Sequence, residues 1–323
     1  MCTAINLHGR RNLFGRTLDL ECSYGETAVS VPRNFPLEFL HEGRVENHSA
    51  IMGIAAVKDG VPLFYDAINE WGLGVAGLNF PNRAVYLQEK RELHNVASFE
   101  FIGFILSQCK NLAEARTLLE KINITKDPFS EGLPTTPLHW IIADKSGTLV
   151  AEPCETGLKV YENPIEVLSN SPEFPYQLTN LSRYMQVSAA PPENKLCPSV
   201  NLTVHSRGMG GIGLPGDFSS ESRFARAAFM KSNAFAEDGE CEISSFFHVM
   251  ATLSVPCGCV IAESGQKVMT RYTSCADLEY GDYYFTVYQN RRIQKLSFKQ
   301  NRLDGNTLAV FPLPDAEDVR ALN

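Results

Sequence analysis

Cysteine 2 is the residue of this chain whose type and place could most directly do chemistry. It follows Met1, and a small second residue is the setting in which an initiator methionine is removed. The new first residue would carry a thiol and a free α-amine, groups whose pKa values in model peptides are about 8.5 and about 8. A nucleophile and its base would then share one residue, as in the N-terminal threonine enzymes. We therefore predict that Cys2 is an N-terminal nucleophile that needs no separate histidine.

Two charged residues could tune this cysteine. Arg16 and Asp19 occur in the segment Phe-Gly-Arg-Thr-Leu-Asp at residues 14–19. A guanidinium beside the thiol would favour the thiolate, and a carboxylate beside the α-amine would hold that amine in place. A regular strand points residues at this spacing to opposite faces, so the chain must bend between them if both reach Cys2. The alternative is an ordinary surface ion pair.

Other catalytic and binding motifs are absent from the sequence or occur out of context. Residues 72–77 and 208–213 fit G-x-G-x-x-G, but no predicted helix follows either one, as a dinucleotide site requires. There is no G-x-S-x-G and no H-E-x-x-H, and Cys257-Gly-Cys259 is too tight for a zinc knuckle. His139, beside Trp140 in an apolar segment, is more simply a core histidine. We expect no cofactor and no metal.

The composition is that of an acidic globular protein. Hydrophobic residues make up 44% of the chain and charged residues 20%, with a net charge of -8. This balance lacks the basic footprint of a nucleic-acid-binding protein. No apolar segment is long enough to cross a bilayer, the start does not resemble a signal peptide, and the nine irregularly spaced cysteines do not suggest disulfides. We expect a cytoplasmic protein without membrane insertion.

The elements that must position Cys2 are predicted to be short strands and a few helices. Strands are expected where apolar runs alternate with turn residues, at residues 3–7, 13–18, 27–31, 51–57, 62–68, 73–78, 138–143, 149–152, 158–161, 267–273, 283–288 and 292–296. Helical periodicity and capping predict helices at residues 98–109, 112–122 and 182–187, from an N-cap at Ser220, and at residues 244–253. The glycine-rich stretch 207–217 is expected to be a loop, and residues 311–323 a polar tail. With no linker or repeat, residues 1–323 are predicted to form one α+β domain.

Several segments together resemble a known family. They are Met-Cys-Thr-Ala at residues 1–4, residues 14–19, Gly-Leu-Asn-Phe-Pro at 77–81, Pro-Leu-His-Trp at 137–140, Leu-Ser-Asn-Ser-Pro at 168–172, Gly-Leu-Pro-Gly-Asp at 213–217 and Ser-Arg-Phe at 222–224. In this order they resemble the choloylglycine hydrolase family, which contains bile salt hydrolases and penicillin V acylases. The resemblance runs from the first residue to about residue 300.

The resemblance implies a fold and a set of roles around the N-terminus. The fold would be an αββα sandwich, in which two antiparallel sheets pack face to face between outer helices. Cys2 would be the nucleophile, and its α-amine would be the general base and later the general acid. Arg16 and Asp19 would position that pair.

Three further residues receive roles from the resemblance. Asn79 would form an oxyanion hole with a backbone N–H, Asn170 would hydrogen-bond near the α-amine, and Arg223 would join the charged network around the nucleophile. Taken without the resemblance, both asparagines are ordinary turn residues. Arg223 falls in the first turn of a predicted helix, where a cation opposes the macrodipole, and this placement suggests an anionic partner or solvent exposure.

The resemblance also narrows the substrate. Penicillin acylases of the family tend to carry Tyr at the position of Asn79, so we expect bile salt hydrolysis, in which a glycine or taurine conjugate is cut to the free bile acid and the amino acid. Penicillin V acylase activity is the alternative within the family. An acylase for N-acyl homoserine lactones or fatty amides, and a catalytically silent small-molecule binding protein, are further alternatives. The family is often tetrameric, so a homotetramer is expected.

An apolar pocket with few polar anchors would hold a steroid core. Leu18, Leu20 and the segments 62–64 and 128–136 are the linings that we expect. Arg207, in the glycine-rich loop, could meet the carboxylate or sulfonate of the conjugate. The alternative for Arg207 is a loop arginine that simply faces solvent.

Overall fold

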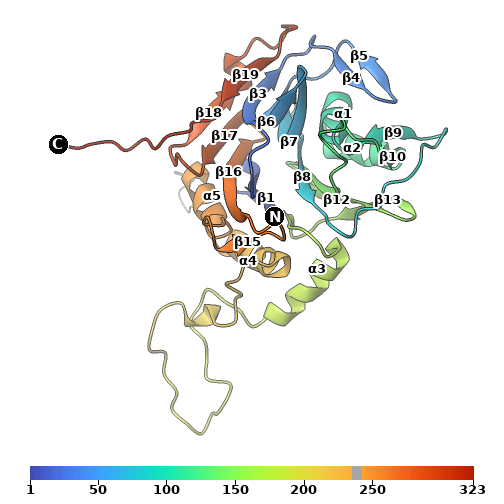
Figure 1. The fold of residues 1–323 in the computed structure, drawn as a ribbon. Helices are drawn as coiled ribbons and strands as arrows, with labels where there is room; N and C mark the ends of the chain where they lie inside the picture. The colour runs from blue at the N-terminus through green and yellow to red at the C-terminus, as the bar shows by residue number, and fades with distance from the viewer. Residues whose placement is uncertain (235–241) are drawn as a thin grey trace.

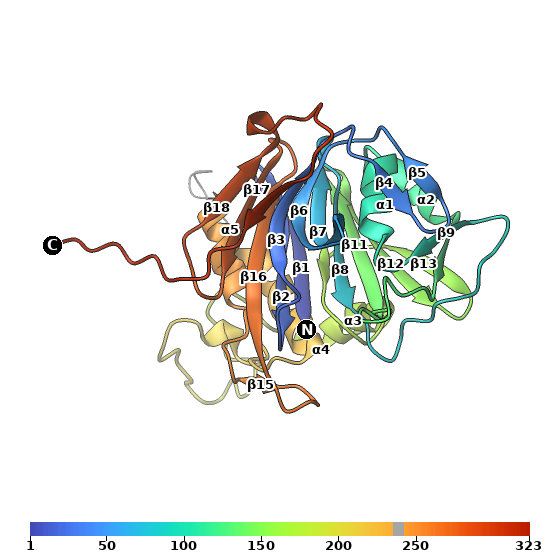
Figure 2. The same cartoon turned by 45° about the horizontal axis from the view of Figure 1, so that its top comes forward.

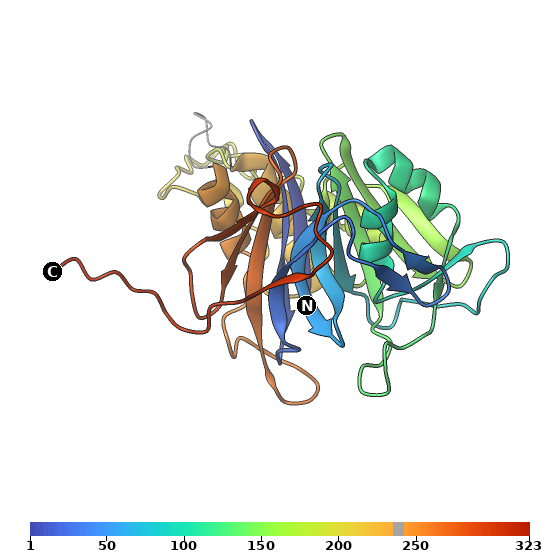
Figure 3. The ribbon, with the colours of Figure 1, turned by 90° about the horizontal axis from the view of Figure 1, so that it is seen from above.

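Two antiparallel sheets packed face to face form the centre of the molecule, and helices cover their outer faces (Figures 1 and 3). The computed structural model describes residues 1–234 and 242–323. Because both faces of each sheet are covered, many strands are buried over most of their length rather than on alternate residues. The arrangement is the αββα sandwich expected from the sequence.

The first sheet carries the N-terminal hairpin at its middle. Its strand order is β14-β1-β2-β16-β17-β18, and β15 pairs with β16. The strands are β1 Cys2–His8, β2 Asn12–Leu20, β14 Val167–Leu168, β15 Val260–Ile261, β16 Lys267–Asp277, β17 Asp282–Val287 and β18 Gln294–Ser297. The N-terminus lies where the two sheets face each other (Figure 3). It is near the helices α3 (Phe174–Asn180) and α4 (Ser220–Asn233) (Figure 2).

The second sheet has the order β13-β12-β11-β8-β7-β6-β3-β19. Its strands are β3 Glu26–Val31, β6 Ile51–Lys58, β7 Val61–Asn69, β8 Gly74–Asn79, β11 Leu138–Asp144, β12 Gly147–Cys154, β13 Gly157–Glu162 and β19 Ala309–Pro312. Two small pairs lie beside it, β4 Leu37–Phe39 with β5 Gly43–Val45, and β9 His94–Ala97 with β10 Ile122–Thr125.

The helices divide between the two outer faces. Helices α1 Phe101–Gln108 and α2 Leu112–Leu119 pack on the second sheet, and α4 Ser220–Asn233 and α5 Glu242–Ala251 pack on the first. Helix α3 Phe174–Asn180 contacts α4 and continues into a 3-10 turn, Leu181–Tyr184. Among the described residues, no helix is both long and apolar enough to cross a bilayer.

Two predicted helices have different bounds in the structure: one ends earlier than expected, and the other begins earlier. Helix α2 stops at Leu119, because Ile122 begins β10 and pairs in parallel with His94 of β9. The helix expected at residues 182–187 is instead α3, which starts earlier because Pro175 occupies its first turn, where a missing N–H costs nothing. Residues 182–184 belong only to the 3-10 turn at the end of α3.

Two smaller predictions also differ from the structure. The N-cap of α4 is Ser219 rather than Ser220, since the Ser219 side chain accepts the hydrogen bond from the Ser222 amide. The tail is not irregular throughout, because Phe311 lies in β19, which pairs with β3 and completes an edge of the second sheet. The apolar residues of the tail pair there with β3, a strand far away in the sequence, so no local pattern predicts this pairing.

Candidate active site

Cys2 opens the central hairpin and is 2% exposed. It is paired with Leu18 of β2, and Ala4 is paired with Arg16. Directly paired residues of an antiparallel hairpin share a face, and alternate residues of one strand do too. The side chains of Cys2, Leu18 and Arg16 therefore project together into the layer between the sheets.

Arg16 bridges from the first sheet to the second. Its side chain is fully buried. The Nη1 atom donates to the backbone oxygens of Tyr65, at 3.0 Å, and Gly77, and the Nε atom donates to the oxygen of Thr17 at 3.2 Å. The Nη2 atom is buried and has no hydrogen-bond partner among the described residues. The guanidinium is thus held by neutral carbonyls and keeps unused donor capacity.

A β-bulge in β7 supplies one of these carbonyls. Ile54 of β6 faces Asp66, but the next residue, Ala55, faces Phe64, so Tyr65 is an extra residue in β7. A bulge leaves its extra residue outside the regular ladder. The Tyr65 oxygen is therefore available to accept from Arg16. The same bulge turns Phe64 to the outer face of the sheet and Asp66 to the inner one.

Asp19 lies on the opposite face of β2 from Arg16. Its Oδ1 accepts from the hydroxyl of Thr270 at 2.6 Å, and its Oδ2 accepts from the hydroxyl of Thr17 at 3.2 Å. Its backbone pairs with Met1: the Met1 amine donates to the Asp19 oxygen at 2.6 Å, and the Asp19 amide donates to the Met1 oxygen at 2.9 Å. Arg16 and Asp19 thus point to opposite faces of β2, as their spacing predicts for a regular strand, and only Arg16 shares the face of the Cys2 side chain.

Asn170 connects the backbone of Cys2 with two other parts of the chain. Its Oδ1 accepts from the Cys2 amide at 2.8 Å and from Nη2 of Arg223 at 2.6 Å. Its Nδ2 donates to the backbone oxygen of Asn79 at 2.7 Å, and its own amide donates to the hydroxyl of Ser220 at 2.9 Å. The side chain therefore holds the very nitrogen that would become an α-amine on loss of Met1.

Arg223 is a second fully buried guanidinium beside the N-terminus. Besides its bond to Asn170, Nη1 donates to the hydroxyl of Thr3 at 2.6 Å and to the backbone oxygen of Cys2, and Nε donates to the oxygen of Phe218 at 3.0 Å. These acceptors are neutral oxygens rather than the anionic partner that the helix position suggested. Arg223 sits early in α4 because its side chain reaches β1, and those bonds outweigh the unfavourable macrodipole.

The two arginines give the site a positive field. Burial lowers the pKa of Arg16, but the facing Cys2 and the anionic forms of Tyr272, Asp66 and Asp19 more than offset it, so this pKa is raised. For Arg223, burial dominates over Asp19 and Cys2 and lowers its pKa. Cys2 therefore lies in the field of two buried guanidinium groups, Arg16 on its own face of the hairpin and Arg223 at its backbone oxygen.

Asn79 is the last residue of β8, next to the site. β11 pairs with β8 at this end, with Leu138 opposite Asn79, and the Asn79 oxygen is held by Asn170. The side-chain Oδ1 is buried without a hydrogen-bond partner among the described residues. Buried amide groups are normally paired, so an unpaired one beside a nucleophile is a candidate for contact with a ligand.

His139 is a core histidine, as predicted. It is fully buried, with Nδ1 at 3.1 Å from Glu152 and Nε2 at 2.8 Å from the oxygen of Ser169. Its ring stacks on Phe80, with centroids 4.2 Å apart. His139 thereby ties together the residues next to Asn79 and Asn170, and it contributes to the shape of the site rather than to its surface.

The expected linings of a substrate pocket have mixed outcomes. Leu18 is buried and Leu20 half-buried beside Cys2. Phe64 belongs to the cluster under α1, on the other face of the second sheet, so the expectation is wrong for Phe64, and the bulge at Tyr65 is the reason. For Pro62 and Leu63 it stays a prediction. Arg207 is exposed, and its role stays a prediction. The segment between α3 and α4 forms a long loop that projects from the body (Figure 1).

The other motifs of the sequence take ordinary places. Residues 72–77 run into β8, and residues 208–213 contain a 3-10 turn, Met209–Gly211. Cys257 and Cys259 are exposed, and the cysteines within the described residues are all free, while Cys241 lies outside them. No group of three or more His, Cys, Asp and Glu gathers as a metal site in residues 1–234 and 242–323.

Comparison with known proteins decides the family. Residues 2–311 match the family described as linear amide C–N hydrolases, choloylglycine hydrolase family. The chain belongs to this family. It is therefore an enzyme of the class that hydrolyses linear amide C–N bonds.

Other members of the family match this chain over its full length. A bile salt hydrolase/transferase from Lactiplantibacillus plantarum is 41% identical over 324 residues, which are 100% of both chains. The structure of a C2A mutant of the conjugated bile acid hydrolase from Clostridium perfringens superposes with a TM-score of 0.93 and 33% identity, covering 100% of both chains. A penicillin V acylase from Agrobacterium tumefaciens shares the fold, with a TM-score of 0.77 and 18% identity over 97% of this chain and 91% of that one.

Three residues that the sequence did not single out form hydrogen bonds to Arg16 and Asp19. Thr270 binds Asp19, Tyr65 offers its carbonyl to Arg16, and Thr17 joins Asp19 to the amide of Thr3, which donates to the Thr17 hydroxyl at 3.2 Å. Threonine is common in strands, so neither Thr17 nor Thr270 stands out in the sequence. Strand register alone brings them to the nucleophile.

Proposed function

We propose that this member of the family cleaves the amide bond of glycine- or taurine-conjugated bile acids and that Cys2 is its nucleophile. The observation that carries the catalytic part is the position of Cys2 between two fully buried arginines, with its backbone nitrogen already held by Asn170. The relatives named bile salt hydrolases support the choice of substrate.

Removal of Met1 is the first step of the proposed mechanism. In the described chain the Cys2 nitrogen is an amide that donates to Asn170. After removal it becomes an α-amine at the same place, with Asn170 as an acceptor that fixes one of its protons. The amine lies on the same residue as the thiol and can take the thiol proton, which leaves a thiolate in the field of Arg16 and Arg223.

Acylation then follows from the placement of the groups. The thiolate attacks the carbonyl carbon of the amide, and the negative charge on the carbonyl oxygen is stabilised by Asn79 and a backbone N–H. Such a donor contributes about 3 to 4 kcal/mol in other hydrolases. The α-ammonium donates a proton to the leaving nitrogen, the C–N bond breaks, and glycine or taurine leaves. The bile acid remains on Cys2 as a thioester.

Deacylation returns the enzyme to its starting state. Water gives a proton to the α-amine and attacks the thioester carbonyl, with Asn79 again next to the oxyanion. The C–S bond breaks, the free bile acid leaves, and Cys2 is again a thiolate beside an ammonium. Leu20 and Tyr65, both half-buried and packed against the cluster that contains Cys2, are proposed to contact the steroid, and Arg207 its acidic tail.

Release of glycine or taurine from the conjugates tests the proposal. The wild-type protein should release the amino acid, and Cys2→Ala should release none while keeping the same circular dichroism and thermal midpoint. Cys2→Ser should be nearly inactive, because a hydroxyl is a far poorer nucleophile near neutral pH. Intact mass of the active protein should show loss of Met1. An active protein that keeps Met1 would contradict the mechanism.

Penicillin V as a parallel substrate tests the specificity. Faster turnover of penicillin V than of any conjugated bile acid would assign the other activity known in the family. If the wild-type protein turned over neither substrate but bound bile acids, a silent binding protein would be the better description.

A further inference from the structure

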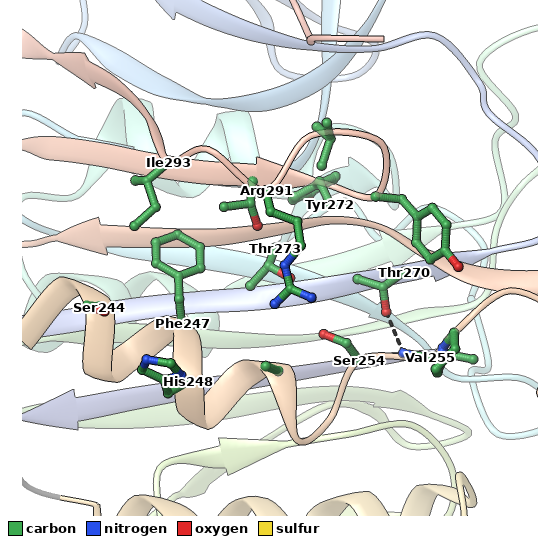
Figure 4. Close-up of a pocket in the computed structure, with 15 residues that line it drawn as sticks. Ser244, Phe247, His248, Ser254, Val255, Thr270, Tyr272, Thr273, Arg291 and Ile293 are labelled. Carbon is green, nitrogen blue, oxygen red and sulfur yellow. Dashed lines mark hydrogen bonds between the residues drawn. The ribbon is translucent and has the colours of Figure 1, made fainter. Parts of the chain in front are cut away.

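A cavity of about 560 Å³ lies on the outer face of the first sheet, on the side of β16 and β17 that α5 covers (Figure 4). Its walls come from α5, from the segment 254–256 that follows this helix, from β16 and β17, and from residues 288–293. Cys2 is not among the lining residues and projects from the opposite face of the same sheet. The cavity is therefore separate from the site described above.

The charge of the cavity is opposite to that of the whole protein. The chain has 37 Asp and Glu against 29 Lys and Arg, yet no carboxylate is among the described residues that line the cavity. Arg291 extends its guanidinium into the space between the strands and Ser254, and His248 lies at the side formed by α5 (Figure 4). A cationic concavity in an acidic protein attracts and retains anions.

The rest of the wall is partly apolar and partly polar. Phe247, Val255, Val287 and Ile293 supply the apolar part, and hydroxyl-bearing residues such as Ser254, Thr273 and Thr286 supply the polar part. Phe247 projects from α5 toward the strands and Ile293 (Figure 4). Ligand pockets of proteins have volumes of about 300 to 1,000 Å³ and combine apolar walls with a few polar groups. The cavity thus suits one molecule with an apolar body and a single carboxylate or sulfonate.

One wall residue is bonded directly to the catalytic region. The hydroxyl of Thr270 accepts from the amide of Val255 at 2.8 Å and donates to Oδ1 of Asp19 at 2.6 Å. Thr270 and Val255 both line the cavity. A ligand that shifts either residue changes the hydrogen bond to Asp19, which directly follows Leu18, the residue paired with Cys2 in the hairpin.

We propose that this cavity is an effector site for an amphipathic organic anion, and that its occupancy is transmitted through Thr270 to Asp19 and Cys2. The ligand acts only to the extent that it binds the two arrangements of the Thr270–Asp19 contact with different affinity. The proposal does not depend on which amide the enzyme cleaves.

Binding is tested with anilinonaphthalene sulfonate, an aromatic sulfonate whose fluorescence rises on binding. Arg291→Glu should weaken its binding about tenfold or more, because a charge-assisted contact is replaced by repulsion. Arg292→Glu is the matched control and should bind as the wild type does, since Arg292 is not a lining residue and pairs with Asp318 at 2.7 Å. Ala251→Trp should also weaken binding, because it fills the cavity and leaves its charge unchanged.

Transmission is tested by the rate at which iodoacetamide alkylates Cys2, read by mass spectrometry of the N-terminal peptide. Saturation with the sulfonate should change this rate about fivefold or more in the wild type and in Arg292→Glu, and should not do so in Arg291→Glu. This readout needs no substrate, so its failure is distinguishable from failure of the proposed function.

Three results would overturn the proposal. One is equal sulfonate binding by the wild type, Arg291→Glu and Ala251→Trp. Another is an alkylation rate of Cys2 that does not respond to the sulfonate in the wild type. The third is a change of molecular mass in solution for Arg291→Glu without a change in sulfonate binding, because the cavity would then be a contact between copies of the chain.

Discussion

Thr270 and Tyr272 are alternate residues of β16, yet their side chains point to opposite faces of the sheet. Thr270 bonds to Asp19 on the outer face, and the hydroxyl of Tyr272 donates to Asp66 across the inner layer. The cause is a register shift in which Thr270 faces Asp19 and Tyr272 faces Leu18, so that Arg271 is an extra residue. This register shift and the bulge at Tyr65 together place polar groups on both faces of the β2 segment beside Cys2.

Thr270→Val should weaken both stability and catalysis. Valine keeps the shape but leaves the Val255 amide and one Asp19 oxygen without the hydroxyl, at a cost of about 1 to 3 kcal/mol in the free energy of unfolding. Thr270→Ser retains the hydroxyl and should recover most of the loss in both kcat and stability. Urea unfolding and kcat measure the two effects. Equal behaviour of the valine and serine variants would show that the methyl group, not the hydrogen bond, matters.

Arg16→Lys should lower kcat/KM for the cleaved amide by about 100-fold. Lysine keeps a charge but lacks the planar fork that donates to the oxygens of Tyr65, Gly77 and Thr17 together. Alkylation of Cys2 by iodoacetamide at neutral pH should slow as well. The exposed Arg91, changed to Lys in the same way, serves as the control and should leave both rates unchanged.

Asp66→Asn should destabilise the layer between the sheets. Asp66 is 1% exposed and accepts from the hydroxyls of Tyr272, Ser274 at 2.8 Å and Tyr283 at 2.5 Å. An amide offers a single acceptor atom, so at least one of these hydroxyls loses its partner, at about 1 to 3 kcal/mol. Chemical denaturation at neutral pH measures the loss.

The loss of stability in Asp66→Asn should depend on pH in one direction. Burial raises the pKa of Asp66 above its usual 3.8, while Arg16 and the three hydroxyls oppose the rise. The folded state binds the proton of Asp66 more tightly than the unfolded state does. Protonated Asp66 therefore stabilises the fold fully below about pH 4, and this stabilisation is lost as pH rises through the pKa of Asp66 in the folded state. The advantage of the wild type over Asp66→Asn should therefore shrink from acidic to neutral pH. The exposed turn variant Asp59→Asn should show no such trend.

Asp217→Asn should affect the start of α4 in the opposite pH direction. Hydrogen bonds from Ser219 and Ser222 lower the pKa of Asp217 from 3.8 to about 2. The stabilisation is then present above about pH 4 and is lost as pH falls toward about 2. Since Asp217 is exposed, the loss at neutral pH should not exceed about 1 kcal/mol. Thermal unfolding against pH measures it, with the exposed Asp315→Asn as the control, and a difference that grows in acid would contradict this assignment.

The sequence determined the local parts of this protein by itself. The alternation of residues in β2 was enough to predict that Arg16 and Asp19 point to opposite faces, and the apolar runs gave most strands within a few residues of their ends. These features depend on near neighbours along the chain, where pleat and turn chemistry act directly. The motifs around Cys2 also sufficed to indicate the family that the comparison then showed.

The tertiary structure alone decided which groups meet at Cys2. Asn170 and Cys2 are 168 residues apart, and Asn170 and Arg223 are 53 apart, yet one amide oxygen serves both partners. The bulges at Tyr65 and Arg271 decided which side chains face inward, and so Phe64 turned outward against expectation. A one-residue shift in register reverses the faces of the strand beyond it, and it is fixed by packing between layers rather than by local propensity.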